Sequence, residues 1–118
     1  MRSRFRGVTA AGEAVAVSSI VAFELWYGVA RSARQAENAK RLAAFFAGPF
    51  ELLAFDSEDA RSAGEIRAEL QAAGTPIGAY DLLIAGQALC RRLTLVTANA
   101  AEFARIRGLK WKDWAAAR

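Results

Sequence analysis

The sequence predicts an α/β domain in which helices flank a parallel β-sheet. Short apolar runs at residues 14–18, 51–56 and 93–97 are typical of buried strands. Longer segments with helical spacing lie between these runs, and this alternation is typical of parallel strands joined by helices. The length of 118 residues is that of one domain, so we expect residues 1–118 to form a single folded unit.

Residues with capping and terminating preferences mark the ends of the first two helices. Ser18 or Ser19 is suited to cap a helix that runs to about Ser32. A second helix is expected over residues 35–47, and the Gly-Pro pair that follows this range is suited to end it.

Three further helices are expected in the second half of the chain. Ser57 is suited to cap a helix that Gly74 ends, and acidic residues in its first turn suit the helix dipole. A helix over residues 78–91 and a short one over residues 100–106 follow. The chain then continues into a basic, aromatic tail with the sequence GLKWKDW.

The composition excludes several classes of catalytic site. The chain has no histidine, which excludes Ser-His-Asp and Cys-His triads, the paired-histidine ribonuclease mechanism and most zinc sites. Cys90 is the single cysteine, so no intramolecular disulfide forms, and we interpret it as a packing residue rather than a reactive thiol. The net charge of +4 and the pI near 9.8 are compatible with a polyanionic partner such as nucleic acid.

The start of the chain has some features of a secretory signal peptide. MRSRFRG is basic, and AVAVSSIVAF a few residues later is apolar. However, Glu13 and Glu24 border the apolar run, and no small-x-small cleavage site follows. No uncharged run approaches the ~18 residues that a membrane span needs. We therefore expect a cytoplasmic protein with no membrane partner.

Two carboxylates stand in apolar surroundings, Asp81 in AYDLLIAGQAL and Glu24 in SSIVAFELWYG. A buried ionised carboxylate is costly unless a cation or hydrogen-bond donors compensate it. Asn99 and Glu102 follow the strand at residues 93–97, and the carboxyl ends of parallel strands meet at one edge of a sheet. Because Mg²⁺ prefers oxygen ligands, these four residues predict a metal site that can activate water for phosphodiester hydrolysis.

Each of these residues also has a structural interpretation that the spacing leaves open. Asp81 can interact with the dipole at the start of its helix, and Glu24 can pair with Arg31 at the surface. Asn99 after a strand is typical of a turn. Glu102 can be an exposed acid at the start of a helix.

Three segments together resemble a PIN domain of the VapC type, the ribonuclease toxin of bacterial toxin–antitoxin pairs. They are VAVSSIVAFELWYGVARS, IGAYDLLIAGQAL and LTLVTANAAEFARIRGLKWKDW, and the resemblance extends from about Val15 to Trp114. It implies a flavodoxin-like parallel sheet flanked by helices and an endoribonuclease that depends on Mg²⁺ or Mn²⁺. It also implies an RNA substrate, a homodimer and a cognate VapB-type antitoxin.

The resemblance assigns catalytic roles to Asp81, Glu24, Glu102 and Asn99, and it makes the first three of them metal ligands. Asp81 matches the aspartate of a Pro-Ile-x-x-x-Asp motif that begins at Pro76. Asn99 stands where many relatives carry aspartate, and it offers a carbonyl oxygen without a charge.

The chain departs from the family pattern at its start. Family members usually begin with a central strand that ends in an Asp-Thr/Ser-Asn motif, whereas MRSRFRG resembles the end of the family's first helix. We therefore expect an N-terminally shortened PIN-like domain that lacks the first family strand. An in-frame apolar strand ending in aspartate, encoded upstream of the start codon, would support this expectation. The alternative function is a catalytically inactive, truncated domain that retains only antitoxin-binding or dimerisation surfaces.

Overall fold

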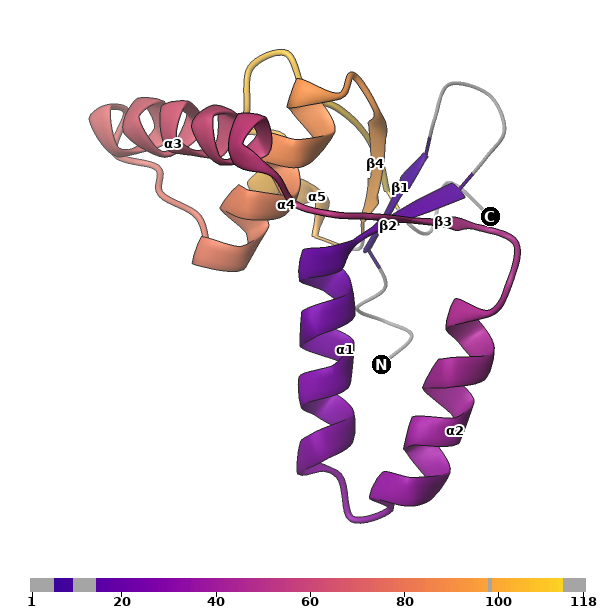
Figure 1. Cartoon of the computed structure of the whole chain (residues 1–118). Helices are drawn as coiled ribbons and strands as arrows, with labels where there is room; N and C mark the ends of the chain where they lie inside the picture. Colours follow the sequence, from indigo (N-terminus) through magenta and orange to yellow (C-terminus); the bar gives the residue numbers. More distant parts are fainter. Residues whose placement is uncertain (1–5, 10–14, 98, 114–118) are drawn as a thin grey trace.

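The structure is a computed structural model that describes residues 6–9, 15–97 and 99–113, and these residues form an α/β fold (Figure 1). The expectation of helices beside a sheet is confirmed. The elements in chain order are β1 (Arg6–Thr9), β2 (Val15–Ser18), α1 (Ser19–Arg31), α2 (Gln35–Phe46), β3 (Glu51–Leu53), α3 (Ser57–Ala72), α4 (Ala79–Cys90), β4 (Thr94–Thr97), α5 (Ala100–Phe103) and β5 (Lys110–Asp113).

The described strands form one sheet in the order β3-β2-β1-β4-β5. The pairs β2–β3 and β4–β5 are parallel. The sequence predicts the first of these pairs, whereas it predicts no strand at the position of β5. β1 is antiparallel to both of its neighbours, so the centre of the sheet is mixed rather than parallel. The connection explains this difference, because only residues 10–14 separate β1 from β2, whereas a parallel pair needs a crossover of about a dozen residues or more.

β1 also corrects the interpretation of the first residues of the chain. MRSRFRG resembles the end of a helix, but Arg6 and Gly7 lie in a strand, and residues 1–5 lie outside the described ranges. β1 gains backbone pairing on both sides, with Arg6 opposite Thr97 and Val8 opposite Ala16. It therefore holds the central position that the resemblance assigns to the family's first strand. Its sequence, RGVT, contains no carboxylate.

The first helix begins as the sequence predicts. The Ser18 hydroxyl caps α1 by accepting a hydrogen bond from the Ile20 backbone N–H at 3.0 Å. The helix α3 begins one residue earlier than predicted, with Asp56 rather than Ser57 at its N-cap. Asp56 and Asp59 form a reciprocal capping box, in which each carboxylate accepts from the backbone N–H of the other. A carboxylate at both ends of the box satisfies two backbone donors at once, which Ser57 does not achieve.

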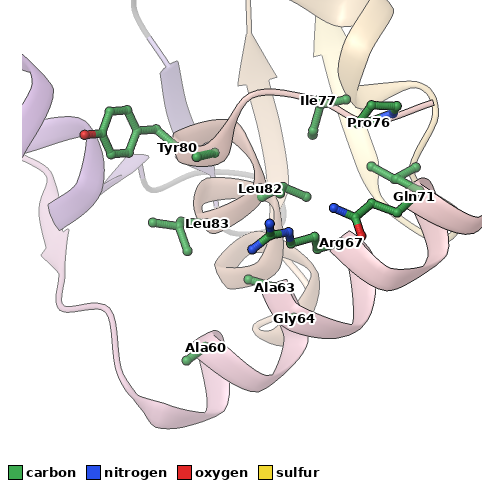
Figure 2. A pocket seen from close by; sticks show the side chains of 12 residues that line it. Ala60, Ala63, Gly64, Arg67, Gln71, Pro76, Ile77, Tyr80, Leu82 and Leu83 are labelled. Carbon is green, nitrogen blue, oxygen red and sulfur yellow. The ribbon is translucent and has the colours of Figure 1, made fainter. Parts of the chain in front are cut away.

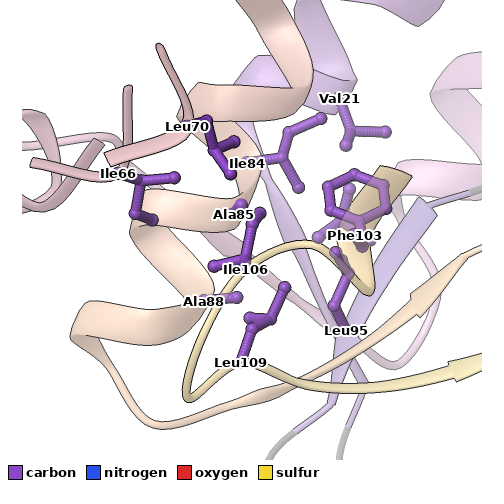
Figure 3. Packing of buried hydrophobic residues seen from close by; sticks show 11 residues of the cluster. Val21, Ile66, Leu70, Ile84, Ala85, Ala88, Leu95, Phe103, Ile106 and Leu109 are labelled. Atoms are coloured by element: carbon purple, nitrogen blue, oxygen red, sulfur yellow. The ribbon is translucent and has the colours of Figure 1, made fainter. Parts of the chain in front are cut away.

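Two helical pairs lie beside the sheet. In Figure 1, α1 and α2 extend together away from the sheet, while α3 runs alongside α4. The helix α4 lies in the middle of the hydrophobic core and contributes Ile84, Ala85 and Ala88, all fully buried (Figure 3). Phe103 and Leu95 pack onto this face from α5 and β4, so the core holds the start of α4 next to the end of β4.

The contact between α3 and α4 is close enough to require glycine. A Cβ atom placed on Gly86 would lie 2.6 Å from the Cα and Cβ atoms of Ala63. Real Cβ contacts do not become that short, so Gly86 and Ala63 let the two helical backbones approach closely. Within the described ranges, none of the helices combines the length and the apolar character needed to cross a membrane.

Candidate functional site

Asp81 lies in the first turn of α4 and is buried, with 8% of its surface exposed. The N-cap of this helix is Gly78, which has no side chain to satisfy the first backbone N–H groups. A carboxylate in this turn is favoured by the helix dipole. The dipole interpretation and a role in metal binding are therefore compatible, because both place a negatively charged group at the start of α4.

Asn99 joins Asp81 to Glu102. The Asn99 side-chain nitrogen donates to Asp81 Oδ2 at 3.3 Å and to Glu102 Oε1 at 3.0 Å. Asn99 is the N-cap of α5, directly after the end of β4, and its backbone N–H donates to Thr97 Oγ1 at 2.9 Å. Three of the four predicted site residues thus meet where α4 begins and β4 ends. This arrangement goes beyond a simple turn role for Asn99.

Glu24 lies on α1, which packs against α4. The ring of Phe23 contacts the ring of Tyr80 edge to face, with centroids 5.5 Å apart. Phe23 directly precedes Glu24, and Tyr80 directly precedes Asp81. The two residues are therefore on adjacent helices at the level of one ring contact, rather than on opposite sides of the molecule. Arg31, the proposed surface partner of Glu24, has its guanidinium carbon 5.5 Å from the centre of the Tyr27 ring.

The oxygen atoms at this site fit a hard divalent cation of the Mg²⁺ type. Such an ion takes one or two carboxylates and keeps several waters, and the carboxylates of Asp81 and Glu102 converge on one small amide group. The part of the chain that the structure describes contains no cluster of three or more acidic or cysteine side chains arranged to hold a metal ion. The donor set that these hydrogen bonds bring together is therefore a pair of carboxylates with an adjacent amide, and Glu24 lies on the neighbouring helix α1.

A second buried carboxylate lies at the opposite end of α4, and the sequence did not single it out. Asp59 is fully buried and forms a bidentate ion pair with Arg91, whose Nη2 lies 2.9 Å from Oδ2 and whose Nε lies 3.3 Å from Oδ1. Gln87 also donates to Asp59 Oδ2 at 3.2 Å. Asp59 and Arg91 are 32 positions apart in the sequence, and an acid at the start of a helix gives no local signal of a distant arginine, so the sequence did not predict this pair.

The surroundings of Asp59 change its pKa in two opposing directions. Burial is the largest single influence and raises the pKa. Hydrogen bonds from Arg91, the Asp56 backbone and Gln87, together with the charge of Arg91, outweigh burial and leave the pKa below its ordinary value of 3.8. Asp59 is therefore ionised at neutral pH and fully compensated, which indicates a structural role in holding α3 to α4.

Cys90 is exposed at the end of α4. The expectation that it is a packing residue is therefore wrong. Loss of water around the sulfur raises the pKa of the Cys90 thiol, and the negative charges of Asp59, Asp56 and Glu58 raise it further. A thiol with a raised pKa carries little reactive thiolate at neutral pH. The interpretation of Cys90 as an unreactive thiol is therefore retained on different grounds.

A pocket of about 420 Å³ opens between α3 and the start of α4. Figure 2 shows Arg67 and Gln71 of α3 facing Leu82 and Ile77 across it. The pocket reaches Tyr80 but none of the candidate site residues, and in Figure 2 the Tyr80 ring points away from Arg67. The pocket is thus next to the candidate site but not part of it.

Comparison with known proteins places these observations in a family. The sequence pattern of the PIN domain matches residues 2–109. The chain belongs to the PIN domain family. It is 43% identical over 98 residues to the tRNA(fMet)-specific endonuclease VapC of Salmonella typhimurium, which covers 83% of this chain and 74% of that protein. It is 41% identical over 100 residues to ribonuclease VapC2 of Rickettsia felis, with 85% and 74% covered.

Solved structures of PIN proteins agree with this assignment. The chain matches the structure of DNA-bound VapBC from Salmonella typhimurium with a TM-score of 0.80 and 42% identity, over 84% of this chain and 74% of that one. It also matches VapBC-5 of Mycobacterium tuberculosis, a member of the VapBC family of toxin–antitoxin systems, with a TM-score of 0.67 and 29% identity, over 83% and 79% of the two chains. The resemblance to a VapC-type PIN domain is therefore confirmed.

Proposed function

We propose that this PIN domain is a VapC-type endoribonuclease, the toxin of a toxin–antitoxin pair, and that it cleaves RNA with Mg²⁺ or Mn²⁺ held by Asp81, Glu24 and Glu102. The kinship to VapC ribonucleases supports the ribonuclease class. The observation that carries the choice of residues is the meeting of Asp81 and Glu102 on one Asn99 amide. Two helix-borne carboxylates that meet at the end of a strand are a suitable site for a cation and a phosphate.

Each candidate residue has its own role in phosphodiester cleavage. A divalent cation, when bound, supplies an activated water and offsets the negative charge that develops on the phosphate. Asp81 is the principal ligand, because it is buried and its position is fixed by the first turn of α4. Glu102 contributes the second carboxylate, Glu24 completes the site from α1, and Asn99 orients the other groups.

The partners follow from the same kinship. VapBC structures are among those that this chain resembles, and we propose a VapB-type antitoxin as its partner. A homodimer and a location in the cytoplasm are further parts of the proposal. The net charge of +4 favours an RNA substrate, and exposed basic side chains such as Lys110 and Lys112 of β5 can attract its phosphate backbone.

The test is a comparison of Asp81→Asn with Glu65→Gln. Asparagine keeps the size of Asp81 but removes its charge, so we expect RNA cleavage to fall at least about 100-fold while the thermal unfolding curve stays cooperative. Glu65 is an exposed acid of α3 paired with Arg61, and its variant should cleave RNA at the wild-type rate. Equal cleavage by wild type and Asp81→Asn would remove Asp81 from the mechanism.

One observation favours a second function, a domain that has lost catalysis and keeps only surfaces for an antitoxin or for a second copy. The central strand β1 carries no carboxylate in its sequence, and no three-acid cluster forms among the described residues. Purified protein incubated with RNA in Mg²⁺ and in EDTA separates the two functions. Cleavage in Mg²⁺ alone supports the ribonuclease, and a folded protein with no cleavage in either supports the second function.

A further inference from the structure

Both hydrogens of one side-chain amide are used to hold two carboxylates together. An amide NH₂ group has two donors, and in Asn99 one points to Asp81 and the other to Glu102, at 3.3 and 3.0 Å. The two carboxylates come from different helices and are 21 residues apart in sequence, since Asp81 is in α4 and Glu102 in α5. Asn99 is thus the link between them.

This link lies between two carboxylates that are both at least partly buried. Asp81 is 8% exposed and Glu102 is half-buried, so water screens their negative charges poorly. A cation between two such carboxylates removes the repulsion, and a neutral NH₂ group removes part of it by presenting two partial positive charges. The Asn99 amide therefore stands where a small cation would be most stable.

The backbone of Asn99 is held by a hydrogen bond of its own, so its amide group can turn without moving the backbone. The Asn99 N–H donates to Thr97 Oγ1 at 2.9 Å, and Thr97 is fully buried at the end of β4. The torsion that turns the amide plane has a broad, roughly two-fold profile. Half a turn about it exchanges the NH₂ group for the carbonyl oxygen, which is a suitable ligand for a hard cation.

We propose that Asn99 is a positioning residue that takes the place of the cation in the metal-free protein, and that it turns its carbonyl oxygen inward when the metal binds. This inference rests on the proposed metal-dependent function. Asn99 therefore lowers the affinity of the site for the metal, because its two hydrogen bonds must break before the cation binds.

Substitution at this position separates the proposal from a simple structural role. Asn99→Asp keeps the size of the side chain but replaces the NH₂ donors by a third negative charge. Without metal, the three carboxylates repel one another and the variant unfolds at a lower temperature than wild type. With metal, the added charge strengthens binding and stability returns. Asn99→Ala loses the link and gains no charge, so it is destabilised without metal and shows no enhanced response to metal.

The experiment measures thermal unfolding of wild type and both variants in EDTA and in rising MgCl₂, with Mg²⁺ affinity from titration calorimetry. We expect Asn99→Asp to unfold at a lower temperature than wild type in EDTA, to show the larger rise with Mg²⁺, and to bind Mg²⁺ at least about tenfold more tightly, which corresponds to about 1.4 kcal/mol. Asn38→Asp is the matched control. Its amide donates to Ser32 at the α1–α2 connection, away from the site, so its unfolding temperature should rise with Mg²⁺ by the same amount as that of wild type.

The outcomes distinguish this proposal from the proposed function. If Asn99→Asp is as stable as wild type in EDTA, or if Mg²⁺ stabilises both equally, Asn99 does not substitute for a cation, whether or not the protein cleaves RNA. If wild type neither binds Mg²⁺ nor cleaves RNA, the ribonuclease proposal fails, and the EDTA measurements still test the link. Should Asn99→Asp unfold completely in EDTA, recovery of its cooperative transition in Mg²⁺ supports the proposal, and no recovery overturns it.

Discussion

The rings of Phe23 and Tyr80 meet edge to face, with centroids 5.5 Å apart and planes inclined by 65°. About half of each side chain remains exposed, at 53% for Phe23 and 47% for Tyr80. The pair joins α1 to α4 one residue before each of the carboxylates Glu24 and Asp81. The contact therefore fixes α1 against α4 next to the positions of both carboxylates.

The Phe23–Tyr80 contact can be measured by a double-mutant cycle of Phe23→Leu and Tyr80→Leu. Edge-to-face aromatic pairs contribute about 0.5–1.5 kcal/mol beyond the area that they bury, so we expect a coupling energy of that size from urea unfolding. A control cycle of Phe23→Leu with Trp111→Leu, on the edge strand β5, should be additive. Additivity in both cycles would show that the ring contact does not hold α1 to α4.

The close contact of α3 and α4 predicts opposite effects for two glycine substitutions. Gly86→Ala places a methyl group 2.6 Å from Ala63 and should destabilise the protein by about 1–3 kcal/mol. Gly64→Ala, on the exposed side of α3, meets nothing within 4 Å and should stabilise by up to about 1 kcal/mol, because alanine favours the helix. Chemical denaturation measures both. A Gly86→Ala variant as stable as Gly64→Ala would contradict the close approach of the helices.

The Asp59–Arg91 pair predicts a stability that depends on pH. The folded-state pKa of Asp59 is lowered, so its contribution is complete above the unfolded-state pKa of about 3.9 and is lost as the pH falls through the lower, folded-state pKa. Arg91→Met leaves the buried carboxylate without its charged partner. We expect it to lower stability at pH 7 by roughly 3 kcal/mol, since breaking a buried pair is costly.

The pH profile separates this effect from a loss of packing. The difference between wild type and Arg91→Met should shrink below about pH 4, because protonation of Asp59 removes the uncompensated charge. Arg61→Met removes an exposed pair with Glu65 and should change stability by less than about 1 kcal/mol at every pH. If the stability difference between wild type and Arg91→Met is constant from pH 7 to pH 3, the loss comes from the packing of the arginine side chain rather than from the charge of Asp59.

The raised pKa of Cys90 predicts slow alkylation. At pH 7 the folded protein should react with iodoacetamide several-fold more slowly than the same protein in urea, although the residue is exposed. The two rates should converge as the pH rises and both thiols ionise. A folded protein that reacts at the unfolded rate at pH 7 would show that the nearby acids do not suppress the thiolate.

Local signals in the sequence predicted much of the fold. The apolar run before Ser18 and its hydroxyl cap determine where β2 ends and α1 begins. The helical spacing over residues 78–91 predicted α4 to within about a residue at each end. In both cases the deciding interactions are hydrogen bonds and side-chain contacts within one turn of the chain, so the sequence contains the relevant information locally.

Two strands escaped prediction because neither has a strand pattern of its own. β1 has the sequence RGVT and β5 has KWKD, with every residue of β5 exposed. Each becomes a strand by pairing with β4, which lies far from β1 in the chain. The burial of Asp59 was missed for the same reason, since its compensating arginine is distant in sequence.

The linear order of residue types determined the five helices, the strands β2, β3 and β4, the family and the four candidate site residues, because motifs and short-range periodicity can be recognised in the unfolded chain. The tertiary structure decided the antiparallel direction of β1 at the centre of the sheet. It also decided that the Asn99 amide lies between Asp81 and Glu102. Both depend on hydrogen bonds between segments that meet only after the chain has folded, and no local pattern encodes those distances.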